Sequence, residues 1–152
     1  MPAVYSNILD AVVTGIQGLN LTDIPPAHVV KRKLVSDRKT VLPTLPGIVV
    51  ASYGNKAPSP TAGTFAKDDI PYQVVVCMFA ASDQDLVANQ DRQFQWGEAI
   101  ASKFRSQPLS GVSSVITCNV VSDFSFVPTL FFNGNADVSW IVLKFTSRET
   151  RG

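Results

Sequence analysis

The sequence is poor in the residues that catalysis and metal binding use most often. It holds one histidine, His28, and two cysteines, Cys77 and Cys118, among 152 residues. A single histidine excludes a catalytic triad with a histidine base, and a multi-histidine metal site, within one chain. His28 follows Pro25 and Pro26 with no acidic residue or cysteine beside it. We therefore expect a structural or surface role for His28.

Short catalytic motifs are also missing. The sequence has no phosphate-binding P-loop, dinucleotide-binding glycine motif, nucleophile elbow or C-x-x-C pair. Asp83, Asp85 and Asp91 are close together, but they lack the loop glycine and terminal glutamate of a calcium-binding loop. The spacing of the carboxylates does not reveal a glycosidase pair. We expect a protein that is not an enzyme and that binds no cofactor and no metal.

Charge and long apolar runs are scarce as well. Charged residues make up 16% of the chain, below the roughly 25% of an ordinary soluble domain, which indicates surface covered by partner subunits. The formal net charge is +1, so the overall balance requires neither nucleic acid nor an anionic membrane. The N-terminus lacks the pattern of a secretory signal, and no run approaches about 20 apolar residues. We expect no membrane association.

Apolar residues are what the chain does have, at 45% of the sequence. That content, over this length, predicts a single folded domain spanning residues 1–152. The stretch from Ile70 to Ser82 is the richest, with β-branched and aromatic residues that favour a strand. Both of its alternating faces are apolar, which predicts an interior strand. Cys77 and Cys118 lie in such strand-like runs, so we expect reduced, packed thiols.

The remaining elements follow from hydrophobic periodicity. A helix is predicted from about Asn7 to Leu19, with Ser6 as its N-cap. A second helix is predicted between Leu86 and Gln107, with a buried stripe of Phe94, Gly97, Ile100, Ala101 and Phe104. Strands are predicted at 47–53, 114–121 and 138–146, an irregular aromatic segment at 123–132, an extended hairpin loop at 54–69 and a flexible tail at 147–152.

This order of elements predicts an α+β fold. We expect an antiparallel or mixed β-sheet with two helices packed on one face and a long β-hairpin arm. The strands carry apolar residues on their other face too, and another copy of the chain is the simplest cover for that face. Trp140 and Val142 of the last strand are therefore candidate interface residues. Trp96 either covers the core edge or anchors a subunit contact, since tryptophan is favoured at binding hot spots.

Two further surfaces leave alternatives open. The densest charge cluster contains the basic residues Lys31, Arg32, Lys33, Arg38 and Lys39. It is either a solvated edge strand whose lysines discourage pairing or a patch that faces nucleic acid or an acidic partner. The aromatic residues Phe124, Phe126, Phe131 and Phe132 belong either to the core or an interface, or to a small-ligand site. A small basic nucleic-acid-binding module is therefore the alternative function.

The layout resembles the tail terminator and tail-completion (neck) proteins of tailed bacteriophages. The resemblance lies in the order of elements and in the texture of three segments: 69–76, 91–98 and the strand around Trp140–Leu143. It implies a structural virion protein that assembles into a homo-oligomeric ring, often a hexamer. Such a ring caps the tail tube, contacts the tube protein and the head connector or neck proteins, and lets DNA pass. It implies a location in the tail or neck of the virion after assembly in the host cytoplasm. The basic cluster would then face DNA or a partner ring.

Overall fold

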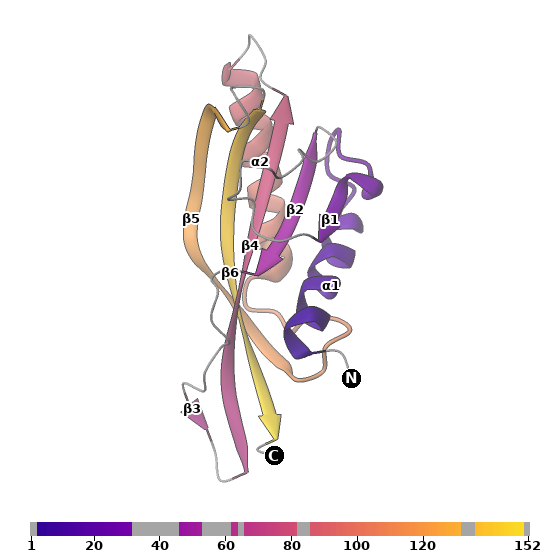
Figure 1. Ribbon diagram of the computed structural model, residues 1–152, viewed down its shortest axis with the longest axis vertical. Helices are drawn as coiled ribbons and strands as arrows, with labels where there is room; N and C mark the ends of the chain where they lie inside the picture. Colours follow the sequence, from indigo (N-terminus) through magenta and orange to yellow (C-terminus); the bar gives the residue numbers. More distant parts are fainter. Residues whose placement is uncertain are drawn as a thin grey trace.

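The structure is a computed structural model that describes residues 3–31, 46–52, 62–63, 66–81, 86–131 and 136–150. Two α-helices and one six-stranded sheet make up this part of the chain (Figure 1). In chain order the elements are α1 (Val4–Gln17), the 3₁₀ helix η1 (Pro26–His28), β1 (Val29–Lys31), β2 (Gly47–Ser52), β3 (Ala62–Gly63), β4 (Lys67–Ala81), α2 (Leu86–Phe104), β5 (Val115–Phe131) and β6 (Ala136–Thr150).

The sheet is mixed, and β4 is an interior strand, as its composition predicted. The strand order is β1-β2-β4-β6-β5, and β3 pairs with the free end of β4. Strand β1 runs parallel to β2, whereas all other pairs are antiparallel. β4 pairs with β2 on one side and along its whole length with β6 on the other. The predicted α+β class is confirmed.

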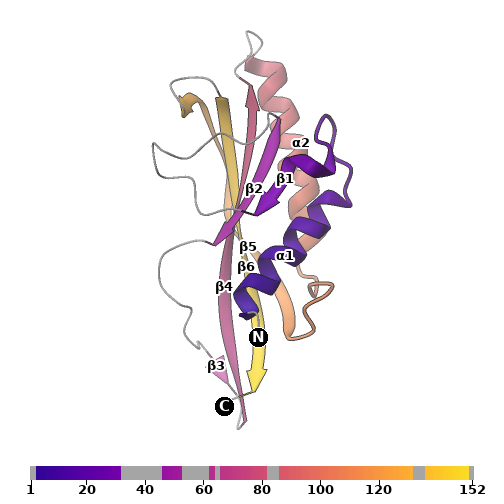
Figure 2. The ribbon, with the colours of Figure 1, turned by 45° about the vertical axis from the view of Figure 1, so that its right-hand side comes forward.

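Both helices pack on one face of the sheet, as predicted (Figure 2). In each helix, apolar residues buried against the sheet recur every fourth position; they are Ile8, Val12 and Ile16 in α1 and Trp96, Ile100 and Phe104 in α2. They form one cluster with residues of one face of β4, which are Tyr72, Val74, Val76 and Met78. Each large apolar side chain buried in this way stabilises the fold by ~1.5–3 kcal/mol. Gly15 lets the helices approach closely, because a Cβ there would lie 2.9 Å from Cζ of Phe104.

Helix α1 begins earlier than predicted, and Ser6 is not its N-cap. The N-cap position is Ala3, which makes no side-chain capping bond. Ser6 lies inside the first turn, where its hydroxyl accepts a hydrogen bond from Lys31 at 3.2 Å. Tyr5 of the first turn packs edge-on against Tyr72, with centroids 5.1 Å apart. This tertiary contact joins residues distant in sequence and does not satisfy the free backbone N–H groups at the helix start.

Helix α2 ends at Phe104, and four of the five residues of its predicted buried stripe are buried: Gly97, Ile100, Ala101 and Phe104. The prediction is wrong for the fifth, Phe94. Phe94 is 40% exposed, whereas Trp96 is only 1% exposed. The buried face also carries polar side chains: Gln93 is fully buried and accepts a hydrogen bond from Ser139 of β6. Asn89 also faces β6, donating to the carboxylate of Asp137. Apolar periodicity alone does not reveal these buried polar residues.

Strands β5 and β6 are both longer than predicted. β5 continues through the segment predicted to be irregular, with four register shifts against β6. The prediction of a flexible tail is wrong for Ser147–Thr150, which belong to β6 and pair with β4. Lys67–Asp69, predicted as loop, likewise belong to β4. The rest of the predicted 54–69 loop, apart from β3 and Ala66, lies outside the described residues.

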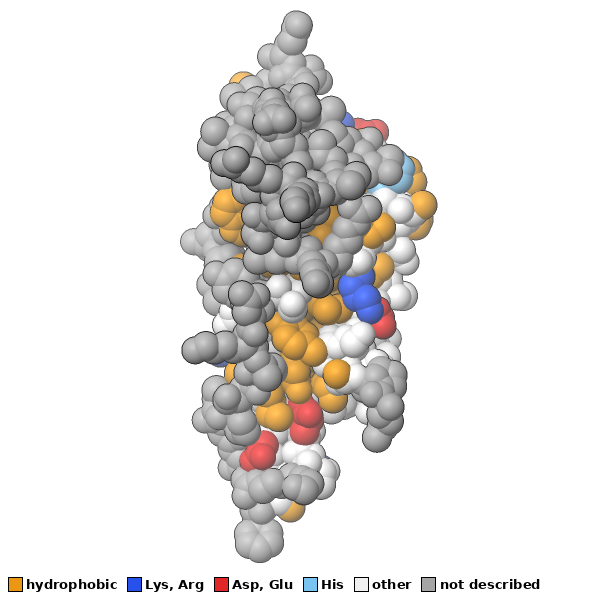
Figure 3. All heavy atoms as spheres, in the orientation of Figure 1, with side chains coloured by type: hydrophobic (Ala, Val, Ile, Leu, Met, Phe, Trp, Pro, Cys, Tyr) orange, Lys and Arg blue, Asp and Glu red, His pale blue; other side chains and the backbone are white. Residues whose placement is uncertain are grey.

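The second face of the sheet carries a smaller apolar cluster. Its members are at most 9% exposed; they are Val49, Ala51, Val75, Cys77, Phe79, Val138 and Val142. These residues are already buried in the single chain, and a second copy of the chain as the cover of this face stays a prediction. Trp140 and Val30 border the cluster and are only half-buried. In Figure 3, apolar side chains are visible in the middle of this face and acidic ones below them.

Candidate assembly surface

The predicted basic patch is represented in the described residues by Lys31 alone. Its ammonium lies 2.6 Å from the carboxylate of Asp10 on α1 and also bonds Ser6. The charge of Lys31 is therefore directed toward α1 and is matched there by an acidic group. The other predicted members of the patch lie outside the described residues; they are Arg32, Lys33, Arg38 and Lys39.

Trp96 lies inside the chain, so its indole has almost no surface to offer another subunit. Its ring nitrogen donates to the carbonyl oxygen of Thr22 at 2.9 Å, and the guanidinium of Arg92 lies 5.2 Å from the ring centroid. Arg92 also reaches Asp23 at 3.2 Å. Trp96 and Arg92 thus fix the segment after α1 onto α2. Of the two interpretations open for Trp96, the core position is the one observed.

Trp140 and Val142 lie on the second face of the sheet, two residues apart on β6. Val142 is buried in the second apolar cluster, whereas Trp140 is half-buried at its border. Only Trp140 of these two therefore retains surface with which to contact another molecule. The side chains of the four candidate phenylalanines lie outside the described residues; these are Phe124, Phe126, Phe131 and Phe132.

A projecting arm is the feature that sequence reasoning located least well. We define the arm as Lys67–Gln73 of β4 together with Lys144–Thr150 of β6, which pair beyond the end of β2 (Figure 1). Arg148 and Asp69 form a bidentate ion pair, with N–O distances of 2.8 and 3.0 Å. This pairing holds the pKa of Asp69 below its usual range, chiefly through the hydrogen bond from Arg148.

Tyrosine hydroxyls fix the base of the arm. The hydroxyl of Tyr72 donates to Glu149 at 2.7 Å, and the hydroxyl of Tyr5 donates to the backbone carbonyl of Gln73. Burial, together with the nearby Glu149 carboxylate, raises the pKa of Tyr72 above its ordinary value. Tyr72 therefore stays a neutral donor near neutral pH. No local sequence signal marks these pairs, because Tyr72 and Glu149 are 77 positions apart.

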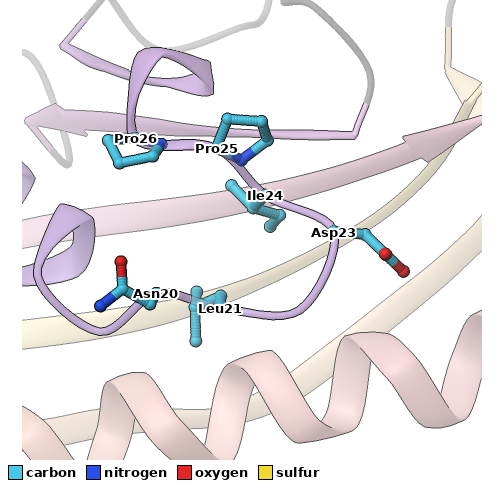
Figure 4. A pocket seen from close by; sticks show the side chains of 6 residues that line it. All are labelled: Asn20, Leu21, Asp23, Ile24, Pro25 and Pro26. Atoms are coloured by element: carbon cyan, nitrogen blue, oxygen red, sulfur yellow. The ribbon is translucent and has the colours of Figure 1, made fainter.

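A shallow hollow lies on the segment after α1 (Figure 4). Its volume is about 360 Å³, and it is lined by Asn20, Leu21, Asp23, Ile24, Pro25 and Pro26. Asn20 and Asp23 adopt left-handed backbone angles, with φ of 50° and 65°. Asn and Asp tolerate this region better than other non-glycine residues. The hollow holds no cluster of catalytic groups.

Large apolar side chains reach the surface at a few described positions. Val87 and Phe94, seven residues apart on α2, are 68% and 40% exposed, and Ile116 of β5 is 42% exposed. Within the described residues, no group of histidine, cysteine, aspartate and glutamate side chains is placed to hold a metal ion. None of the helices in that same part is long and apolar enough to cross a membrane.

Comparison with known proteins gives a fold but no family. No protein-family model matches the sequence, and no curated protein matches it. Solved structures do match. One is a chain of the structure described as "Virion of native gene transfer agent (GTA) particle", with a TM-score of 0.57 and 11% identity. The match covers 99% of this chain and 100% of that chain. At this identity the likeness shows a shared fold, and it extends over both chains from end to end.

Proposed function

We propose that this chain is a structural protein of a phage-like virion. The observation that carries the proposal is the likeness of fold, over the whole of both chains, to a component of a gene transfer agent particle. A structural role also suits the surfaces described above, which offer apolar contact and ion pairs without an assembled catalytic group.

Within the virion, we propose the role of a tail terminator or neck ring. Copies of the chain, six by resemblance, form a closed ring that caps the tail tube and joins it to the head. A ring uses two different surfaces of each copy, which meet head to tail. Trp140 at the border of the second face and the exposed pair Val87 and Phe94 on α2 are the candidates for those surfaces.

The partners of the proposed ring are the tail tube protein and the head connector or neck proteins. DNA passes through the ring, and the basic segment that begins at Lys31 faces DNA or a partner ring. The protein is then located in the tail or neck of the virion, after assembly in the host cytoplasm. The alternative of a nucleic-acid-binding module gains nothing from the described residues, because Lys31 is paired with Asp10.

The proposal is tested on the purified protein, alone and mixed with the tail tube protein of the same genome. We expect rings in negative-stain electron micrographs, free or seated on tube ends, and a ring-sized mass in light scattering. Trp140→Glu should abolish the rings and leave a folded, smaller species. Ser102→Glu, which adds the same charge at an exposed position on α2, should leave the rings intact. A native protein that neither forms rings nor binds tubes would contradict the proposal.

A further inference from the structure

The edges of the sheet are where a strand of another molecule would add. An unpaired edge presents backbone N–H and C=O groups, and a second copy could extend the sheet there. Edge segments in the described part of the chain include β1, β5 and the stretch Ile70–Gln73 of β4. This stretch lies between the pairing of β3 with Asp69 and that of β2 with Val74.

The edge of β4 has lost one hydrogen-bond donor and one acceptor. The hydroxyl of Tyr5 occupies the carbonyl of Gln73, as described above. Backbone groups of successive residues point to opposite sides of a strand, so residues 69, 71 and 73 share one side. Residue 71 is Pro71, which has no N–H to donate. An added strand would therefore meet a missing donor and an acceptor already in use, two residues apart.

The edge of β5 also has a backbone carbonyl that is already in use. If the backbone N–H and C=O of Gln73 point away from β6, then those of its partner Lys144 on β6 point toward β5, where they face Asn119. The backbone N–H and C=O of the preceding residue, Cys118, must then point away from β6, toward the open edge. The backbone N–H of Ser106, in the turn after α2, indeed donates to the carbonyl of Cys118 at 2.8 Å. The hydrogen bonds at both edges are thus consistent with a single assignment of which residues point their backbone groups outward.

Further features make these edges poor templates. Strand β5 contains Pro128 and four register shifts against β6, and bulges of this kind disturb the row of edge groups. Strand β1 has three residues. The side-chain nitrogen of Gln17 on α1 lies 3.4 Å from the carbonyl oxygen of Val29 in β1. Short edge strands, and cover of an edge by a helix, are ways in which natural sheets avoid edge pairing.

We infer that the edges of this sheet are blocked against strand addition, chiefly by Tyr5 and Pro71 at β4 and by Ser106 at β5. The groups that occupy the edge carbonyls come from α1 or from the turn after α2, so the helical layer protects the edges as well as covering one face. Copies of the chain consequently associate through side chains and do not extend the sheet. The inference stands independently of the proposed ring.

The first test measures whether the backbone amide of residue 71 points away from β6. In the variant Pro71→Val, residue 71 regains an N–H, which should point away from β6. Its amide should exchange with deuterium roughly 100-fold faster than that of Tyr72, which points toward β6. Measurement is by NMR or fragment mass spectrometry of the folded variant. Equal protection of the two amides would overturn the inference, because residue 71 would then face the ladder.

The second test removes the Tyr5 hydroxyl and the proline at residue 71, which are proposed to prevent strand addition at β4. The double variant Tyr5→Phe with Pro71→Val should form large species that bind thioflavin T, at concentrations where the native chain does not. The matched control, Pro108→Val, makes the same proline substitution at an exposed position outside the sheet and should behave like the native chain. Circular dichroism establishes that each variant is folded. If the double variant is unfolded, each single variant is scored in the same way. Folded edge variants with native mass would overturn the inference.

Discussion

Strands β4 and β6 pass through two regions of the molecule that hold them in different ways. In the body, β4 lies between β2 and β6, and α1 and α2 cover one face of it. In the arm, the same two strands pair mainly with each other and are fixed by the ion pair of Asp69 with Arg148 and by Tyr5 and Tyr72. The body depends on buried apolar area, which extends into the base of the arm through Tyr72 and Phe145. The outer end of the arm depends on directed contacts such as the ion pair of Asp69 with Arg148.

This difference has consequences for stability. Burial of apolar side chains contributes a large share of folding free energy and is lost in proportion to the atoms removed. Surface ion pairs contribute at most about 1 kcal/mol, and they fix geometry more than they stabilise. We therefore expect the body to determine whether the chain folds and the arm contacts to determine the direction in which the two strands project.

The largest effect should come from the apolar body. Ile100→Ala removes a fully buried side chain between α2 and the sheet, and should lower the free energy of unfolding by ~2–5 kcal/mol. Ile70→Ala, in the arm, removes the same atoms from a half-buried position and should cost clearly less. Denaturant unfolding of both variants measures the difference. Equal losses would remove the distinction between the two regions.

A smaller effect should come from the polar pairs of the body. Ser139→Ala leaves the buried side-chain oxygen of Gln93 without the hydrogen bond that Ser139 donates. An unsatisfied buried acceptor costs about 1–3 kcal/mol. Ser102→Ala, at an exposed position on α2, is the matched control and should change little. Thermal unfolding compares them, and a null effect at Ser139 would mean that this polar pair does not fix α2.

The arm should respond to acid. The pKa of Asp69 is lowered in the folded state, mainly by the hydrogen bond from Arg148. The contribution of Asp69 to stability is therefore complete above its unfolded pKa of about 3.9 and is lost as pH falls through the lower folded value. Amide exchange of the arm, followed by NMR, should accelerate in that range before the body unfolds. In Arg148→Ala this acid-induced step should shift to higher pH.

The smallest effect concerns the two cysteines, which change reactivity and not stability. Burial raises the pKa of Cys77 and that of Cys118 to about 12 each. Both thiols stay protonated at neutral pH, and the thiolate is the reactive form. An alkylating reagent should therefore label neither cysteine until the chain unfolds. The variant Ser102→Cys, with an exposed thiol on α2, should label at once, and rapid labelling of the native chain would contradict the burial of both thiols.

Sequence patterns predicted the body better than the arm. The interior position of β4 followed from the two apolar faces of its own residues, and the helices followed from their periodicity. The arm depends on pairs such as Asp69 and Arg148, which are 79 positions apart, so Ser147–Thr150 were mistaken for a tail. The face of α2 was predicted apart from Phe94, but the burial of Gln93 was not, because its partner Ser139 lies on β6. The candidate interface was only partly predictable, because the burial of Val142 depends on the tertiary fold.

Helix α1 connects distant parts of this molecule mechanically. Near its start, Tyr5 holds the carbonyl of Gln73 in the arm. Near its other end, Gly15 lies so close to the ring of Phe104 that no side chain fits between them. Helix α1 therefore contacts both the arm and α2. Because one continuous helix makes both contacts, α1 links the position of the arm to that of α2.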